Sequence, residues 1–213
     1  MKIAEIIQVL EKLAPLSLQE SYDNAGLLLG NKTWECTGII CSLDATEKVI
    51  LEAKSKGCNL VVAHHPIIFG GLKKLNGNNY IEKTVITAIK NDIAIYAIHT
   101  NLDNIIDGVS KKMANKLGLI NTQILLPKKN QLQKLYTFVP KNESDKVRDA
   151  IFAVGAGVIG NYSECSFNID GVGTFKAGEN TNAFVGEKGT RHYENEVKLE
   201  IIYPIWLKYQ VIN

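Results

Sequence analysis

The sequence lacks the features that would assign it to several specialised classes of protein. It has only 4 cysteines among 213 residues, and none forms a Cys-x-x-Cys pair, so neither a zinc finger nor a small disulfide framework is indicated. The net charge of +2 is small and the lysines are scattered in pairs, which argues against nucleic-acid binding. We therefore expect free thiols, a reducing compartment and no nucleic-acid partner.

Long apolar runs are missing too. The first apolar run is broken by Glu5 and Gln8, so it lacks the core of a secretory signal peptide. No stretch reaches the ~18–20 apolar residues that cross a bilayer. Walker and Gly-x-Ser-x-Gly motifs are also absent from the sequence. These observations predict a cytoplasmic protein without a membrane partner.

The first part of the chain alternates between predicted strands and helices. We expect helices over 3–13, 46–56, 80–91 and 107–117, and strands over 37–43, 59–63 and 93–98. Asp44 and Asp107 stand where they would cap the helices that follow them. This alternation of strands and helices predicts an α/β domain with a mainly parallel sheet.

The residue pattern changes around residues 126–133, where we expect a linker. Beyond it we expect strands over 134–139, 165–169 and 197–203, a helix over 143–153, and a Gly- and Asn-rich loop over 171–189. That order suggests a small α+β unit, ferredoxin-like in outline and incomplete. We therefore predict domains over 1–128 and 129–213.

Three of the four histidines follow predicted buried strands. His64 and His65 end one strand, and His99 ends the next. The carboxyl ends of parallel strands meet at one edge of a sheet, where ligands bind. Adjacent histidines on a regular strand point to opposite faces, which would suit two metal ions with one imidazole each.

Asp103 follows His99 by four residues and offers a carboxylate that can bridge two divalent ions. Imidazole and carboxylate together suit zinc, iron, manganese or cobalt. Two such ions can activate a nucleophile and polarise an electrophile. The spacing alone leaves open a second interpretation, in which the histidines are a hydrogen-bonded strand end. Capping fully explains Asp44.

A second set of candidate ligands is weaker. His192 and Glu196 would share one face of a helix. The surrounding residues alternate as in a strand, where these side chains would lie about 13 Å apart at ~3.3 Å per residue. We therefore do not expect them to be ligands. Gly171 and Gly173 do not open a helix and do not form a dinucleotide-binding motif.

Five ordered motifs resemble a known family. Three of them are Tyr22-Asp-Asn-Ala-Gly-Leu-Leu-Leu-Gly30, Ala63-His-His-Pro-Ile-Ile-Phe69 and His99-Thr-Asn-Leu-Asp103. They resemble the GTP cyclohydrolase 1 type 2 homologs, also called NIF-three-like dinuclear metal proteins. The second half, from Gly155 to Phe167 and from Gly171 to Phe175, looks like the PII/CutA-like domain inserted in longer bacterial members.

The resemblance implies that His64, His65 and Asp103 bind two divalent metal ions per subunit, with His99 in the same motif. In the family, a later His and Glu complete the site, and this sequence is expected to end before them. The resemblance also implies a homohexamer with metal sites facing an internal cavity. It does not identify a catalytic residue.

Three functions remain open from the sequence. The resemblance implies a metal-dependent hydrolase of the GTP cyclohydrolase type that acts on a nucleotide or a similar small molecule. The alternative is a non-enzymatic, metal-responsive or regulatory binding protein whose inserted domain senses a small-molecule ligand. A purely structural protein comes third, because the free energy needed to place the polar His-His-Pro segment at a buried strand end would then be unexplained.

Overall fold

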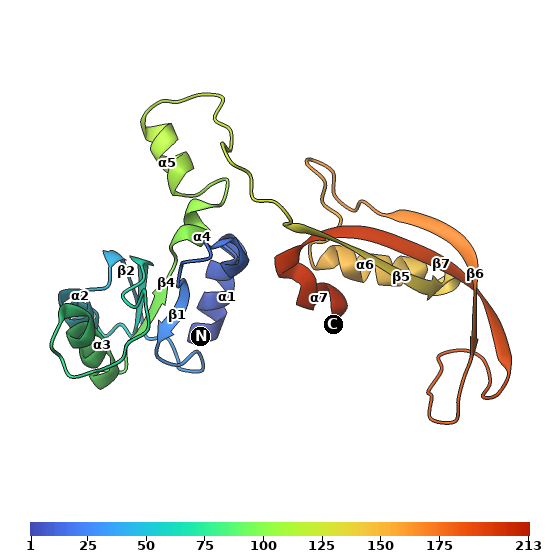
Figure 1. The fold of residues 1–213 in the computed structure, drawn as a ribbon, viewed down its shortest axis with the longest axis horizontal. Coiled ribbons are helices and arrows are strands. Elements are labelled where there is room, and N and C mark those ends of the chain that lie inside the picture. Colours follow the sequence, from blue (N-terminus) through green and yellow to red (C-terminus); the bar gives the residue numbers. More distant parts are fainter. The chain divides into compact units, whose positions relative to one another are not determined.

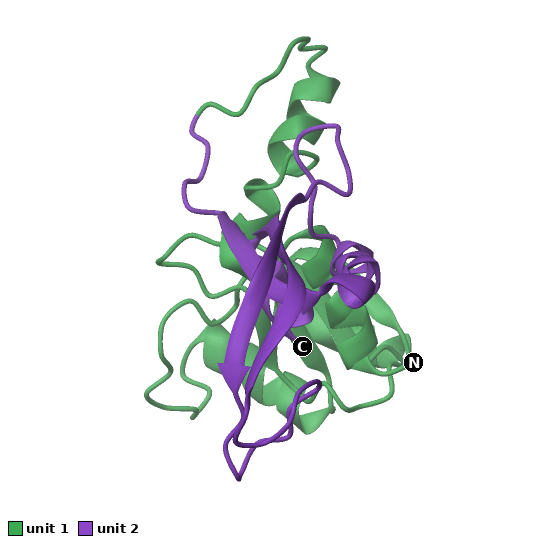
Figure 2. Cartoon of the chain, turned by 90° about the vertical axis from the view of Figure 1, so that its right-hand side faces the viewer, with its two compact units in different colours: residues 1–125 green, residues 126–213 purple.

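The computed structural model describes residues 1–213, which fall into two compact units. Unit 1 comprises Met1–Leu125 and unit 2 comprises Leu126–Asn213, coloured separately in Figure 2. Each unit has its own sheet and its own apolar core. No helix in either unit has the length and hydropathy needed to cross a bilayer.

Unit 1 is built on a four-stranded sheet with the order β1-β4-β3-β2. β2 (Ile39–Asp44), β3 (Leu60–His65) and β4 (Ala94–Ala97) run parallel to one another. β1 (Gly26–Leu29) pairs antiparallel with β4 at one edge. The mixed α/β character and the three parallel strands were predicted, whereas β1 was not.

Both faces of this sheet are covered by helices. Leu60 and Val62 pack with α1 (Ile3–Leu13) on one face. Val61 and Ala63 pack on the other with α2 (Glu47–Ser55) and α3 (Tyr80–Lys90), as Figure 1 shows for the two sides of the sheet. The uniformly apolar β3 is therefore buried on both faces, as its sequence predicts.

Three short elements complete unit 1. The 3₁₀ helix η1 (Leu16–Leu18) follows α1, and α4 (Thr100–Asp103) follows β4 after Ile98 and His99. α5 (Val109–Lys116) begins after Gly108 without a side-chain cap, so the expected cap at Asp107 is wrong. The physical reason is position: Asp107 lies two residues before the helix, outside the N-cap site.

Unit 2 contains a three-stranded antiparallel sheet with the order β5-β7-β6. Its strands are β5 (Leu132–Pro140), β6 (Phe167–Lys176) and β7 (Arg191–Pro204), and its helices are α6 (Ser144–Ala153) and α7 (Lys208–Ile212), with η2 (Lys141–Glu143) and η3 (Ile205–Leu207) as 3₁₀ turns. One face of β7 packs against α6 through alternate residues, among them Leu199 and Ile201.

The predicted loop over 171–189 is partly wrong. β6 continues through Gly171 and Gly173 to Lys176, and β7 begins at Arg191 rather than 197. A Cβ atom at Gly173 would lie 1.9 Å from Oε2 of Glu196. A larger residue here would displace the flexible end of the Glu196 side chain. The strands extend through these glycines because β6 pairs antiparallel with β7 all the way from Phe167 to Lys176.

Candidate metal centre

The three clustered histidines come from the ends of two neighbouring parallel strands. His64 and His65 are the last residues of β3, and His99 lies two residues beyond the end of β4, immediately before α4. The register pairs Ala63 with Ala97, which aligns the two strand ends. The parallel topology thus brings all three imidazoles to the carboxyl edge of the sheet, as in other α/β folds.

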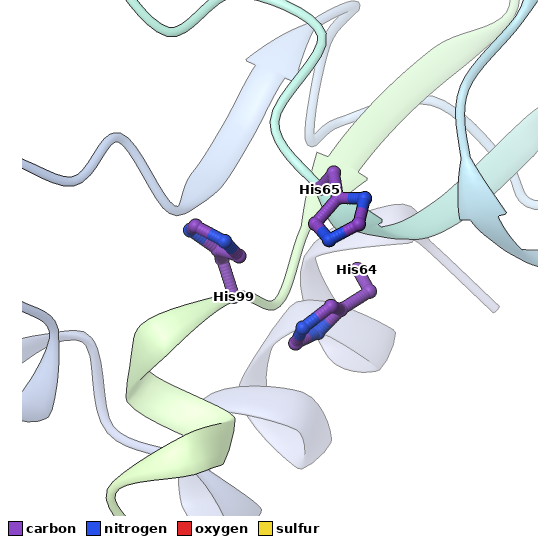
Figure 3. Close-up of side chains that lie close together, drawn as sticks. All are labelled: His64, His65 and His99. Carbon is purple, nitrogen blue, oxygen red and sulfur yellow. The ribbon is translucent and has the colours of Figure 1, made fainter. Parts of the chain in front are cut away.

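The three rings surround a common space (Figure 3). Their centroids are 5.0 Å apart for His64 and His65, 5.2 Å for His64 and His99, and 5.6 Å for His65 and His99. One potential ligand atom from each lies within 4.8 Å of the other two. Two ligands on one tetrahedral zinc are separated by roughly 3.4 Å, given bonds of ~2.0–2.1 Å. The three donors are therefore grouped closely enough that they could hold a metal ion.

The expected divergence of His64 and His65 is wrong, because their rings face the same space. Both residues lie in β3, and alternation along a strand fixes only the direction of the Cα–Cβ bonds. Beyond Cβ the two rings turn toward one space, with Nδ1 of His64 held by the carbonyl oxygen of Ile98 and Nδ1 of His65 held by Asp44. Alternation along the strand therefore does not assign one imidazole to each of two ions.

Each imidazole is held through its Nδ1 atom. Nδ1 of His64 lies 2.9 Å from the carbonyl oxygen of Ile98. Nδ1 of His65 lies 2.8 Å from Oδ1 of Asp44, and Nδ1 of His99 lies 2.8 Å from Oδ1 of Asp23. A carbonyl or carboxylate accepts a hydrogen bond, so each Nδ1 carries the proton in the neutral ring and each Nε2 keeps a lone pair for a metal.

Asp103 lies at the border of the cluster. It ends α4, one helical turn after His99, and its Oδ1 is 4.0 Å from Nε2 of His64. The carboxylate is 38% exposed, so it can move toward an ion without leaving an apolar pocket. The structure thus brings together all four residues that the sequence singled out, and their role as metal ligands stays a prediction.

Asp23 is a site residue to which the sequence assigned no role. Its side chain is fully buried, and its Oδ2 accepts hydrogen bonds from the backbone N–H and hydroxyl of Thr100. Burial raises the pKa of this carboxyl, but hydrogen bonds from Thr100, His99 and the Asn24 backbone together hold the pKa below its ordinary value. Asp23 therefore stays ionised and fixes both His99 and the start of α4.

Asp44 has a different role from the expected one. The cap of α2 is Thr46, whose hydroxyl accepts from the backbone N–H of Val49 at 3.4 Å. Asp44 is the last residue of β2, and the parallel register places it beside His65. The capping interpretation was wrong because Asp44 lies two residues before the cap, inside the strand.

His192 and Glu196 lie in unit 2 on β7, as the alternating sequence predicted. Nε2 of His192 lies 2.8 Å from Oε2 of Glu194, its neighbour on the same face of the strand. Neither residue belongs to the three-histidine group. The donor set of unit 1 is thus imidazole nitrogen with a carboxylate nearby, which favours zinc, iron, manganese or cobalt over calcium.

A family model described as Duf34/NIF3 (NGG1p interacting factor 3) matches residues 1–184. The chain belongs to this family. The Duf34/NIF3 chain is 42% identical over 216 residues to the "GTP cyclohydrolase 1 type 2 homolog" of Halalkalibacterium halodurans, covering 100% of this chain and 58% of that protein. It is 38% identical over 210 residues to the Bacillus subtilis protein of the same name, covering 98% of this chain and 56% of that protein.

Among solved structures, the chain is similar to "The Crystal Structure of Bacillus cereus protein related to NIF3". The TM-score is 0.83 and the identity 38%, with 100% of this chain and 56% of that chain covered. This Duf34/NIF3 chain thus spans little more than half the length of the relatives it matches. The family resemblance that the motifs predicted is confirmed.

Proposed function

We propose that this Duf34/NIF3 chain is part of a dinuclear metal-binding protein that acts as a metal-dependent hydrolase of the GTP cyclohydrolase type. The observation that carries the proposal is the cluster of His64, His65 and His99, each with Nδ1 tied to an acceptor and Nε2 left for a metal. The substrate class, a nucleotide or similar small molecule, comes from the names of the relatives.

The residues of unit 1 fit a divalent ion. Three neutral imidazole nitrogens and the carboxylate of Asp103 would hold it, and the ligand spread of up to 4.8 Å is compatible with two ions sharing the cluster. Bound ions would supply Lewis acidity and lower the pKa of a water ligand. Asp23 and Asp44 hold the imidazoles of His99 and His65 through Nδ1, which would leave Nε2 of each ring for such ions.

The proposed reaction is ring opening of a purine nucleotide. Water would add to the C8 carbon of GTP, and hydrolysis would end in the release of formate. The test is to load the protein with zinc, manganese or iron, supply GTP, and assay formate. Turnover that is lost in His64→Ala and retained in His192→Ala supports the proposal. If formate is not released with any of the three metals, the cyclohydrolase activity is refuted.

The wider context of the protein is also proposed. We expect a homo-oligomer, a hexamer in the full-length protein, in the cytoplasm and without a nucleic-acid partner. The small net charge of +2 supports the last point. Unit 2 is proposed to be a PII/CutA-like, ferredoxin-like domain inserted in the metal-binding domain. Its support is the order β5-α6-β6-β7, with an antiparallel sheet covered by α6 on one face.

The alternative function, a metal-responsive regulatory protein, is favoured by one feature of unit 2. A cavity of about 650 Å³ lies between β5, α6 and α7, lined among others by Leu135, Val147 and Ile151. Its volume is that of a small-molecule site. If the protein is a sensor, a ligand bound in this cavity should change its metal content without being consumed. Consumption of the ligand would identify a catalyst instead.

A further inference from the structure

Two exposed aromatic side chains lie beside the histidine cluster. Tyr22 is 64% exposed and Phe69 is 52% exposed. They belong to separate segments, because Tyr22 precedes β1 and Phe69 follows β3. Other aromatic side chains of the chain are exposed too, but this pair is distinguished by its place next to the potential metal donors, where a ligand of the metal site could contact it.

The ring of Phe69 contacts the imidazole of His99, and the ring of Tyr22 contacts that of Phe69. The ring centroid of Phe69 lies 6.3 Å from that of His99, and the two planes are nearly perpendicular at 84°. The centroid of Tyr22 lies 6.4 Å from that of Phe69, with the planes inclined at 41°. Because the rings of Phe69 and Tyr22 are inclined to each other, a planar ligand ring can stack on one of them and meet the other with its edge, and in contact with Phe69 it lies near His99.

The segments that carry the two rings are tied to each other and to the site. The side-chain amide of Asn24 donates to the carbonyl oxygen of Ile68 at 2.6 Å. Asp23, between Tyr22 and Asn24, holds His99. Each aromatic ring is therefore one residue away from an anchored position, and the pair is set in place before a ligand arrives.

We propose that Tyr22 and Phe69 form an aromatic platform for the planar heteroaromatic ring of a nucleoside-like ligand, with one side chain stacked on the face of that ring and the other against its edge, next to the histidine cluster. Aromatic side chains accept the π face of any base, and each stacked base gains roughly 5- to 150-fold in affinity. The proposal rests on the proposed function for its choice of a nucleotide and adds the residues that would bind the base.

The test is a calorimetric titration of the manganese-loaded protein with guanosine, and separately with inorganic triphosphate, which has no base. Phe69→Leu and Tyr22→Leu keep apolar volume but remove the π face, whereas Phe69→Trp keeps it. Tyr80→Leu is the matched control, since Tyr80 is a tyrosine of the same unit that is 69% exposed. Metal content and native mass are recorded for every variant.

We expect Phe69→Leu and Tyr22→Leu each to weaken guanosine binding by about fivefold or more, with Phe69→Trp and Tyr80→Leu close to wild type. Triphosphate binding and metal content should not change in any of the four variants. Guanosine binding that is absent in the wild type, or equal in wild type and Phe69→Leu, would overturn the proposal. A change of native mass in both leucine variants would also overturn it, because the pair would then be a subunit contact.

The aromatic platform and the proposed hydrolase activity can be refuted independently of each other. Guanosine binding that depends on Phe69, without formate release from GTP, would refute the hydrolase and keep the platform. Formate release from GTP that is unaffected by Phe69→Leu and Tyr22→Leu would refute the platform and keep the hydrolase.

Discussion

At the residue scale, the two carboxylates that hold imidazoles of the cluster, Asp23 and Asp44, differ in their burial. The Asp23 side chain is fully buried and accepts hydrogen bonds at both carboxylate oxygens, whereas the Asp44 side chain is 57% exposed and accepts one from Nδ1 of His65. A buried acceptor that loses its charge leaves donors unsatisfied, while an exposed one can exchange its partner for water. The two carboxylates should therefore respond differently to the same substitution.

Asp23→Asn should be the more damaging of the two changes. An amide group would meet the N–H of Thr100 or the Nδ1–H of His99 donor to donor, so we expect the free energy of unfolding to fall by about 1–3 kcal/mol. Metal affinity should fall by roughly 10- to 100-fold, because His99 loses its orientation. Urea denaturation and equilibrium dialysis measure the two effects.

Asp44→Asn is the matched control for stability. Its amide oxygen can still accept from Nδ1 of His65, and the side chain is exposed, so stability should stay within about 0.5 kcal/mol of wild type. Equal destabilisation by Asp23→Asn and Asp44→Asn would contradict the distinction between the buried and the exposed carboxylate.

The residue-scale chemistry could be predicted only in part. The sequence placed His64, His65, His99 and Asp103 at strand ends, and the structure brings them together. It could not assign Asp23, because the contact with His99 joins positions 76 residues apart. No local pattern records such a pairing. The only available signal was that Asp23 lies inside a motif that resembles the family.

At the element scale, β3 and β4 were predicted from short runs of apolar residues, and both are buried. β1 was missed because it has only four residues and is identified by pairing with β4, not by its own pattern. The extents of β6 and β7 were underestimated because glycines suggested a loop. Local patterns thus predicted the central strands, and tertiary pairing determined the edges.

Also at the element scale, the side chain of Glu82 fixes the loop that precedes α3. Glu82 is buried, and its carboxylate accepts from the backbone N–H groups of Asn78 at 2.9 Å and Asn76 at 3.2 Å. The Asn78 N–H holds the pKa of Glu82 below its ordinary value, and the Asn76 N–H and the Asn79 amide add to this against the opposing effect of burial. The carboxylate therefore closes the Asn-rich loop onto the helix.

The hydrogen bonds to the Glu82 carboxylate predict that the stability of the protein depends on pH. The folded-state pKa is lowered, so the contribution of Glu82 is fully present above its unfolded pKa of about 4.3 and is lost as the pH falls through the folded value. Glu82→Gln should remove that part of the acid dependence. Denaturation curves at pH 6 and at successive values below pH 4.5 measure it. Identical slopes for wild type and Glu82→Gln would contradict the assignment.

At the scale of the whole molecule, each unit has its own core. Ile95 is fully buried in unit 1, and Leu199 is 1% exposed in unit 2. Replacement of either by alanine should cost about 2–5 kcal/mol in its own unit. Hydrogen exchange should accelerate in residues 1–125 for Ile95→Ala and in residues 126–213 for Leu199→Ala. Acceleration across both units in both variants would show one cooperative body instead.

The central claim is that the three-histidine cluster of unit 1 binds divalent metal, and metal analysis tests it most directly. The protein is equilibrated with zinc, manganese or iron, dialysed, and its metal content per chain is measured. We predict up to two ions per chain in the wild type and in His192→Ala, and their loss in His64→Ala and His65→Ala. Equal metal content in all four proteins would contradict the claim.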